Sequence, residues 1–297
     1  MKKNTFDRNF DAVATTLLAL MLIAAAYPLF FVVIASISDP SKVSMGKVSF
    51  WPVGLTFAGY KKVIEYKEIW VGYRNTLMYV VGYTSLSVFI TMISGYALAR
   101  KELPGRRGIM LFMTFTMFFS GGLIPMYLLV NGLGLVGKPI VLVIVGTVSV
   151  YNIIVARTFI QSSIPDDLFE AASLDGCNHT KFFFNVVLPL SPALLAVITL
   201  FAAVGQWNSW FNAMIYLRKT EHMPLQMVLR QLIVSESTMQ QSLESGSMMG
   251  DDAAQQAMIV ESMKYAVIIV STLPIMCLYP FVQKYFVKGV MIGSIKG

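Results

Sequence analysis

The chain has 297 residues, of which 56% are hydrophobic and only 13% are charged, and its formal net charge is +7. Soluble domains carry about 25% charged residues, so this composition excludes an ordinary soluble globular protein and indicates a polytopic membrane protein. The positive charge suits a chain that lies against anionic lipid headgroups. No basic and aromatic patch accompanies it, so we expect a lipid bilayer as a partner and no nucleic acid.

The sequence lacks the motifs of several enzyme classes. It contains no Walker run of the form Gly-x-x-x-x-Gly-Lys-Ser/Thr, so it does not bind ATP through that motif. Its two histidines, His179 and His222, are far apart and have no cysteine partners, which argues against a metal site. The apolar segments carry no ionisable residue near their centres, unlike most ion-coupled transporters. We therefore expect no catalytic residue, no metal and no cofactor, and an energy source in another protein.

Long segments without charged residues predict an all-α fold with six transmembrane helices in a single domain, residues 1–297. Each segment has about 18 residues or more, enough to cross a hydrocarbon core of ~30 Å. An even number of spans places both termini on one side. Lysine and arginine are almost equally numerous in the two sets of loops, so charge barely favours either orientation. The approximate spans are 12–36, 75–99, 108–130, 139–160, 186–207 and 263–285.

The third predicted span contains Gly121, Gly122 and Pro125. Paired glycines and a proline break or kink a membrane helix and let backbones approach closely. Two interpretations remain open here. The segment either packs tightly against a neighbouring helix or forms a bend that lines a translocation path.

Uncharged amides stand beside aromatic residues in the fourth and fifth predicted spans. Asn152 lies in the fourth, and Gln206, Trp207 and Asn208 end the fifth. Amides hydrogen-bond hydroxyl groups, and aromatic faces cover the apolar faces of pyranose rings, so these four residues are candidates for a sugar path. An interfacial aromatic belt with amide bonds between helices explains the same pattern equally well.

Residues 164–182 form a short polar interruption between two apolar segments. Pro165 suits the first position of a helix, and Asp166 and Asp167 suit its first turn, where the helix dipole favours carboxylates. Gly176 can adopt the left-handed conformation that ends a helix. The pattern therefore predicts a short helix that stops at Gly176, and a restart at Asn178 or His179.

The same segment resembles the EAA loop of ABC importer permeases, whose pattern is Glu-Ala-Ala, three residues, Gly, and then Leu-Pro about a dozen residues later. The run Phe-Phe-Ser-Gly-Gly-Leu-Ile-Pro at 118–125 and the tail at 283–297 look like those of the carbohydrate permeases, the maltose-type or oligosaccharide branch. Cys177 departs mildly from the usual alanine. The positions that match the EAA pattern are Glu170, Ala171, Ala172, Asp175, Gly176, Leu188, Pro189 and Pro192.

This resemblance implies the type I permease fold of an ABC importer, in the cell membrane with both termini cytoplasmic. The EAA residues would form a coupling helix that docks on a cytoplasmic ATPase. The implied partners are a second permease subunit in a heterodimer, two copies of the ABC ATPase, an extracytoplasmic solute-binding protein and a carbohydrate substrate, an oligosaccharide by this branch.

The loop 208–262 would then lie outside the cell. Its glycine-rich tip would contact the solute-binding protein. The alternative from another class is a polytopic channel or scaffold subunit without ATP coupling, and co-purification of an ATPase would distinguish the two. The residues of the tip are Gly246, Ser247, Met248, Met249 and Gly250.

Overall fold

The computed structural model describes residues 5–244 and 263–277, and every regular element in that part of the chain is a helix. The chain divides into two compact units. The first unit comprises residues 1–69 and 229–273, and the second comprises residues 70–228 and 274–297. The second unit contains the EAA segment and the four candidates for a sugar path.

The first unit begins with α1 (Thr5–Ser36), followed by α2 (Pro40–Ser44) and α3 (Ala58–Glu65). It also includes residues 263–273 of the helix Met263–Cys277. The end of α1 packs on the α2 segment through Ile34 and Val43. Most of the apolar surface of α1 is exposed, as expected for a helix whose surroundings are lipid.

Two helices in the described part of the chain are long and apolar enough to cross a membrane: α1, and α4 (Lys67–Ala99). Two further pairs of consecutive helices are each long and apolar enough only if the two helices of the pair are taken as one span, and each pair is bent sharply at a short break. The pairs are Arg106–Phe118 with Leu123–Gly132, and His179–Leu190 with Pro192–Trp207. This gives two to four spans among the described residues, so the count of six stays a prediction.

The third predicted span is broken, as its glycines predicted. α5 (Arg106–Phe118) and α6 (Leu123–Gly132) meet at an angle of 113°. Gly122 at the break has a φ of +85°, which an L side chain rarely adopts. A Cβ atom on Gly122 would have no neighbour within 4 Å in the described chain, so this glycine supplies a turn rather than a close helix contact.

The fourth predicted span is not a continuous helix either. α7 (Val141–Ile144) ends early, and α8 (Val150–Ser163) begins only after an irregular stretch. Gly146 in this stretch has a φ of +82°, which interrupts the α-helical backbone.

The fifth predicted span is preceded by short helical pieces. After α9 (Asp166–Leu174) come α10 (His179–Phe182), a π-helical turn (Phe183–Val187), α11 (Leu188–Leu190) and α12 (Pro192–Trp207). The axis bends by 83° at the break before Pro192. Proline lacks an N–H and clashes with the preceding turn, which explains both the bend and the π-helical turn before Pro189. The remaining elements are α13 (Phe211–Tyr216), a short 3-10 turn (Thr220–His222) and α14 (Leu225–Glu244).

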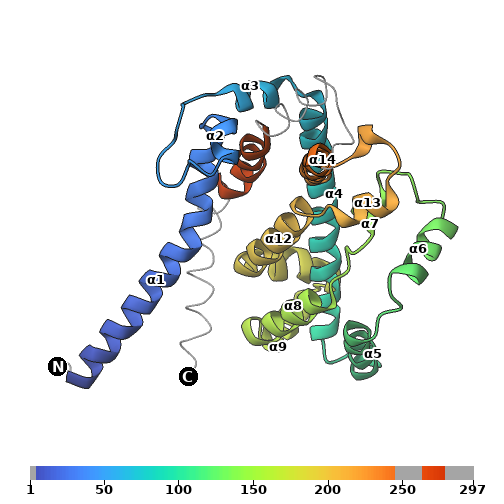
Figure 1. Ribbon diagram of the computed structural model, residues 1–297. Helices are drawn as coiled ribbons and strands as arrows, with labels where there is room; N and C mark the ends of the chain where they lie inside the picture. Colours follow the sequence, from blue (N-terminus) through green and yellow to red (C-terminus); the bar gives the residue numbers. More distant parts are fainter. Residues whose placement is uncertain (1–4, 245–262, 278–297) are drawn as a thin grey trace. The chain divides into compact units, whose positions relative to one another are not determined.

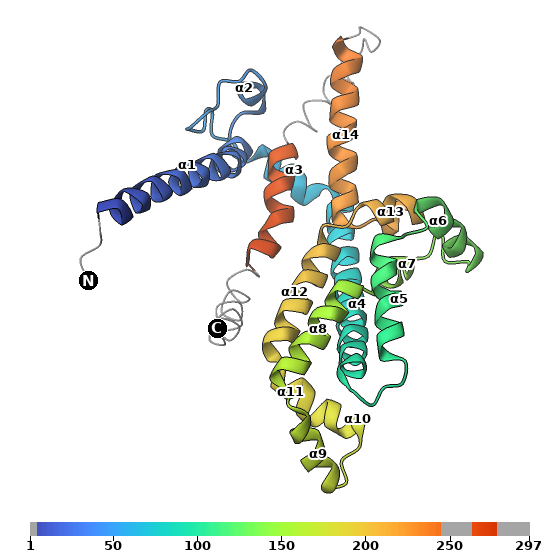
Figure 2. The same cartoon turned by 90° about the horizontal axis from the view of Figure 1, so that it is seen from below.

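The core of the second unit lies where α8 and α12 pack beside α4 (Figure 1). The α9, α10 and α11 segments gather at one end of this unit (Figure 2). α4 and α8 approach closely at Gly95, where an added Cβ would lie 2.7 Å from the Cβ of Ala156. The buried residues of this core are Met92, Tyr96, Ala99, Ala156, Ile160, Ile164, Phe182, Phe183, Val187, Leu194 and Ile198.

We predict that Gly95→Ala destabilises the protein, because the added methyl group meets both Ala156 and the backbone N of Arg157 at 3.1 Å. Overpacking costs ~1–3 kcal/mol, more than the ~0.5–1 kcal/mol that alanine gains over glycine in a helix. The midpoint of thermal unfolding in detergent micelles measures the effect.

Gly108→Ala in α5 is the matched control, because no atom lies within 4 Å of its added Cβ. Its midpoint should stay the same or rise. The double variant Gly95→Ala/Ala156→Gly should recover part of the lost stability. An unchanged midpoint in Gly95→Ala would contradict the close contact between α4 and α8.

Candidate functional site

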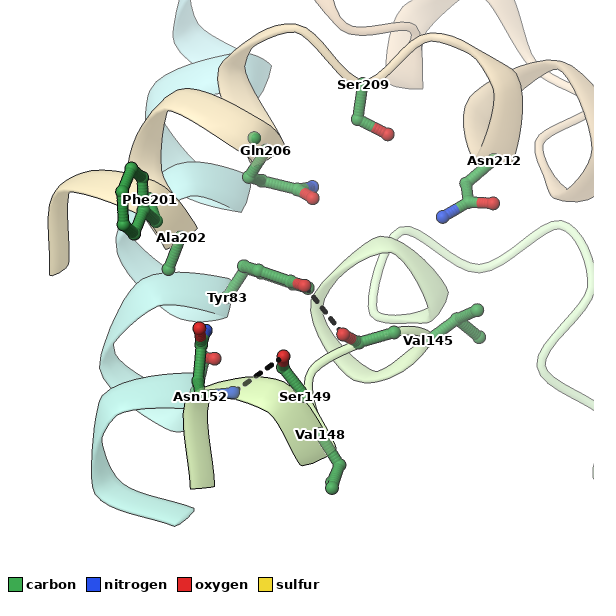
Figure 3. Close-up of a pocket in the computed structure, with 13 residues that line it drawn as sticks. Tyr83, Val145, Val148, Ser149, Asn152, Phe201, Ala202, Gln206, Ser209 and Asn212 are labelled. Carbon is green, nitrogen blue, oxygen red and sulfur yellow. Dashed lines mark hydrogen bonds between the residues drawn. The ribbon is translucent and has the colours of Figure 1, made fainter. Parts of the chain in front are cut away.

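A polar cavity of about 500 Å³ lies in the second unit, beside the break between α7 and α8. Its size falls within the ~300–1,000 Å³ of small-molecule sites. α4, the α7–α8 loop, α8, α12 and the start of α13 all contribute to it (Figure 3). No charged side chain lines it. The lining residues are Tyr83, Ser87, Val145, Gly146, Val148, Ser149, Asn152, Phe201, Ala202, Gly205, Gln206, Ser209 and Asn212.

Side chains from neighbouring helices satisfy the backbone carbonyls around the break. The Tyr83 hydroxyl donates to the carbonyl of Gly146 at 2.6 Å, and the Ser87 hydroxyl donates to that of Thr147 at 2.9 Å. Nε2 of Gln206 donates to the carbonyl of Leu142 at 3.1 Å. Non-helical backbone at membrane depth requires such partners, so these three side chains stabilise the irregular wall of the cavity.

Amides and hydroxyls face one another across the cavity. Ser149 caps α8, where its Oγ accepts the backbone N–H of Asn152 at 3.3 Å, and both side chains project into the space opposite Gln206 (Figure 3). Ser209 and Asn212 complete the polar lining from the side of α13 (Figure 3). These uncharged donors and acceptors can hydrogen-bond a hydroxyl-rich ligand.

The structure brings together two of the four residues proposed for a sugar path. Asn152 and Gln206 line the cavity, whereas Trp207 and Asn208 are not among its lining residues. Trp207 is buried and meets the ring of Tyr73 edge-on at 6.1 Å. The Asn208 amide donates to the Val204 carbonyl at 3.0 Å on the exposed end of α12.

Sequence reasoning missed Tyr83, Ser87, Ser149 and Ser209 as cavity residues. Asn212 extends the amide and aromatic run that begins at Gln206, so the sequence pattern does point to it. The hydroxyl residues of α4 carry no such signal. Their partners lie about 60 positions later in the chain, with separations of 63 and 60 residues for the two hydrogen bonds.

The interruption at 164–182 forms the predicted helix, α9, with Pro165 as its N-cap, one position before the predicted one. Its end is closed by two backbone bonds, from Gly176 N–H to the Ser173 carbonyl and from Cys177 N–H to the Ala172 carbonyl. This pattern is the Schellman motif, and the φ of +75° at Gly176 completes it. The predicted stop at Gly176 and restart at Asn178 are confirmed, since Asn178 caps α10.

α9 has one face against the core and one face exposed. Phe169 and Ala172 pack on the core of the second unit. Glu170 and Ala171 are exposed, and Leu174 is 90% exposed, so this face of α9 offers an apolar side chain beside a carboxylate. Among the other EAA positions, Asp175, Gly176 and Pro189 are exposed, and Leu188 packs at the edge of the core.

The first residue of α9 carries an ion pair. Oδ2 of Asp166 lies 2.8 Å from Nζ of Lys101, and Oδ1 lies 3.6 Å from Nη1 of Arg100. The hydrogen bond from Lys101 lowers the pKa of Asp166 below its usual value. The carboxylate therefore stays ionised near the positive end of α9, which it stabilises.

The predicted contact for a solute-binding protein, Gly246–Gly250, lies outside the described residues, as does the tail at 283–297. Nothing in the described structure bears on either prediction.

The chain matches a known family and known structures over most of its length. Residues 87–292 match the family described as "Binding-protein-dependent transport system inner membrane component". The chain is 36% identical to the "Polygalacturonan/rhamnogalacturonan transport system permease protein YtcP" of Bacillus subtilis (strain 168), over 98% of this chain and 99% of the relative. It is 24% identical to the "Melibiose/raffinose/stachyose import permease protein MelC" of the same organism, over 95% and 96%.

A solved structure, the "Crystal structure of a bacterial ABC transporter involved in the import of the acidic polysaccharide alginate", has a TM-score of 0.86 and 32% identity, covering 96% of this chain and 99% of that one. These matches identify an all-helical, multi-pass protein of the inner membrane, whose ATPase is a separate subunit. The chain therefore belongs to the family of binding-protein-dependent transport system inner membrane components, the permease subunits of ABC importers.

Proposed function

We propose that this permease carries an oligosaccharide and that the cavity beside the α7–α8 break is its half of the translocation path. The observation that carries the proposal is the lining, which combines hydroxyls and amides with two aromatic rings and has no charged side chain. Asn152, Gln206 and Asn212 supply hydrogen bonds to sugar hydroxyls, and Tyr83 and Phe201 supply ring faces. The carbohydrates named for its relatives support the same substrate class.

The assembly in this proposal contains a second permease, two copies of the ATPase and a solute-binding protein, with six spans and cytoplasmic termini. α9 docks on the ATPase through its exposed face. The support is Leu174, a large apolar side chain that is 90% exposed, beside the exposed carboxylate of Glu170. A partner cleft that covers Leu174 would also desolvate Glu170 and strengthen its bond to a basic group.

In the cavity, Asn152→Ala and Asn212→Ala should raise the KM for sugar uptake. Each variant loses a hydrogen bond to substrate, worth ~0.5–1.5 kcal/mol, which corresponds to about a two- to tenfold change. The measurement is uptake of labelled galacturonan oligosaccharides, with raffinose as a neutral comparison, into proteoliposomes that contain the complete importer.

Asn131→Ala is the matched control, because Asn131 is an exposed amide of α6 outside the cavity. Asn208→Ala tests whether the path continues beyond the cavity. Uptake kinetics like those of the unmodified protein in both Asn152→Ala and Asn212→Ala would exclude the cavity as the path for these sugars.

At the coupling helix, Glu170→Ala and Leu174→Ser should each weaken binding of the ATPase. A charge-assisted hydrogen bond at a buried interface is worth ~1.5–3 kcal/mol, so Glu170→Ala should lower the affinity at least about tenfold. Quantitative co-purification of the ATPase with the permease measures this. Thr180→Ala, an exposed change in the neighbouring α10, should bind normally. Full ATPase binding and full coupling in both α9 variants would rule out this face as the docking surface.

A further inference from the structure

Arg100 directly follows α4, and its side chain is buried in a cage of aromatic rings although the residue is charged. Only 5% of its surface is exposed. Its guanidinium carbon lies 5.0 Å from the ring centroid of Phe169, 5.2 Å from that of Tyr96 and 5.5 Å from that of Phe182. These rings come from α9, α4 and α10, so one cation joins three elements.

The surroundings of Arg100 explain how a buried cation is tolerated. Nε and Nη1 have no hydrogen-bond partner in the described structure. The ring faces replace water through cation–π attraction, which strengthens when the cation is desolvated. Asp166 contributes the nearby negative charge. Because that carboxylate is partly exposed, its ion pair adds little compared with the rings.

Phe169 immediately precedes Glu170, and it is held from more than one direction. Its ring stacks on His179 with centroids 4.5 Å apart and an interplanar angle of 12°. His179 is held in turn, because its Nδ1 forms a hydrogen bond of 3.1 Å with the Tyr96 hydroxyl. The cage therefore sets the orientation of α9 relative to the end of α4.

Toward its other end, α4 is hydrogen-bonded to the segment that leads into α14. The Asn75 amide donates to the carbonyls of Glu221 and Met223 at 2.8 and 3.1 Å. The Tyr79 hydroxyl donates to the carbonyl of His222 at 2.9 Å. Between the two ends α4 is one helix of 33 residues without proline, about 50 Å long.

We propose that Arg100 is a positioning residue for energy coupling: it fixes α9 to α4, so that a displacement of α9 by the ATPase moves α4 as a rigid element. The proposal rests on the proposed docking of the ATPase on α9. It differs from that function because Arg100 faces the core, away from the docking face. α4 then transmits the movement past the cavity wall, where Tyr83 and Ser87 bond the α7–α8 break. It reaches residues 221–223, whose carbonyls Asn75 and Tyr79 bond.

Arg100→Lys tests this, since lysine keeps the charge but loses the planar group that stacks on rings. α4 does not depend on Arg100 for its place, because Arg157 and Gln161 of α8 donate to the carbonyls of Leu98 and Ala99 at 3.2 Å. We expect the ATPase to co-purify normally and basal hydrolysis to persist. Stimulation of hydrolysis by the loaded solute-binding protein should fall on the order of fivefold, the scale of a modest allosteric coupling.

Phe169→Leu should also lower the stimulation, because it removes the ring nearest to the Arg100 guanidinium. In the double variant, the combined effect of Arg100→Lys and Phe169→Leu should be smaller than the sum of the two single effects, because the two changes share this contact. Arg107→Lys, at an exposed site in α5, should behave as the unmodified protein. Normal stimulation in Arg100→Lys would overturn the proposal. Loss of ATPase binding in Arg100→Lys would also overturn it, since Arg100 would then serve docking. Failure of the docking proposal itself would show separately, in Glu170→Ala and Leu174→Ser.

Spin labels distinguish positioning from general stability. One label is placed at Asp167 in α9 and the other at Val81, an exposed site of α4, after Cys177 and Cys277 are replaced by alanine. Positioning requires a narrow distance distribution in the unmodified importer and a broader one in Arg100→Lys. A lower unfolding midpoint with an unchanged distribution would assign Arg100 a purely structural role and overturn the inference.

Discussion

Backbone that leaves the helical conformation inside an apolar unit must find hydrogen-bond donors within the protein, and the second unit is arranged around this constraint. The α7–α8 break frees carbonyl groups, and side chains of α4 and α12 donate to them. These three side chains, Tyr83, Ser87 and Gln206, also line the cavity beside Ser149, Asn152, Ser209 and Asn212. Part of the polar lining therefore also stabilises the irregular wall.

α4 connects the features of this unit because it is the longest uninterrupted element there. Asn75 and Tyr79 of α4 bond residues 221–223, its middle bonds the break, and its last residues lead into the aromatic cage around Arg100. The other candidate spans of this unit are broken by glycine or proline. A long uninterrupted helix beside several broken ones can move as one rigid element, while the broken helices can bend at their glycine and proline positions.

Features set by nearby residues could be predicted from the sequence. The short helix at 164–182, its stop at Gly176 and the break at Gly122 all follow from local backbone chemistry. The break at Gly146 could not, because an isolated glycine in an apolar run is common in membrane helices. The cavity was found only in part. Asn152 and Gln206 could be identified because they are polar residues in apolar segments. Tyr83 and Ser87 could not, because their hydrogen-bond partners lie far away in the sequence. The family match argues against the alternative of a channel or scaffold without ATP coupling, because it identifies a permease of an ABC importer.

The Schellman motif at Gly176 has a consequence for how such a permease can change partners. The end of α9 is closed by bonds among residues 172–177, while its orientation depends on Arg100, which directly follows α4. Exposed residues of α9 can therefore be exchanged without disturbing either the length of the helix or its tilt. If α9 is the docking helix proposed above, its recognition surface can change in evolution independently of the contacts that orient the helix, so one ATPase can come to serve several permeases through changes at very few positions.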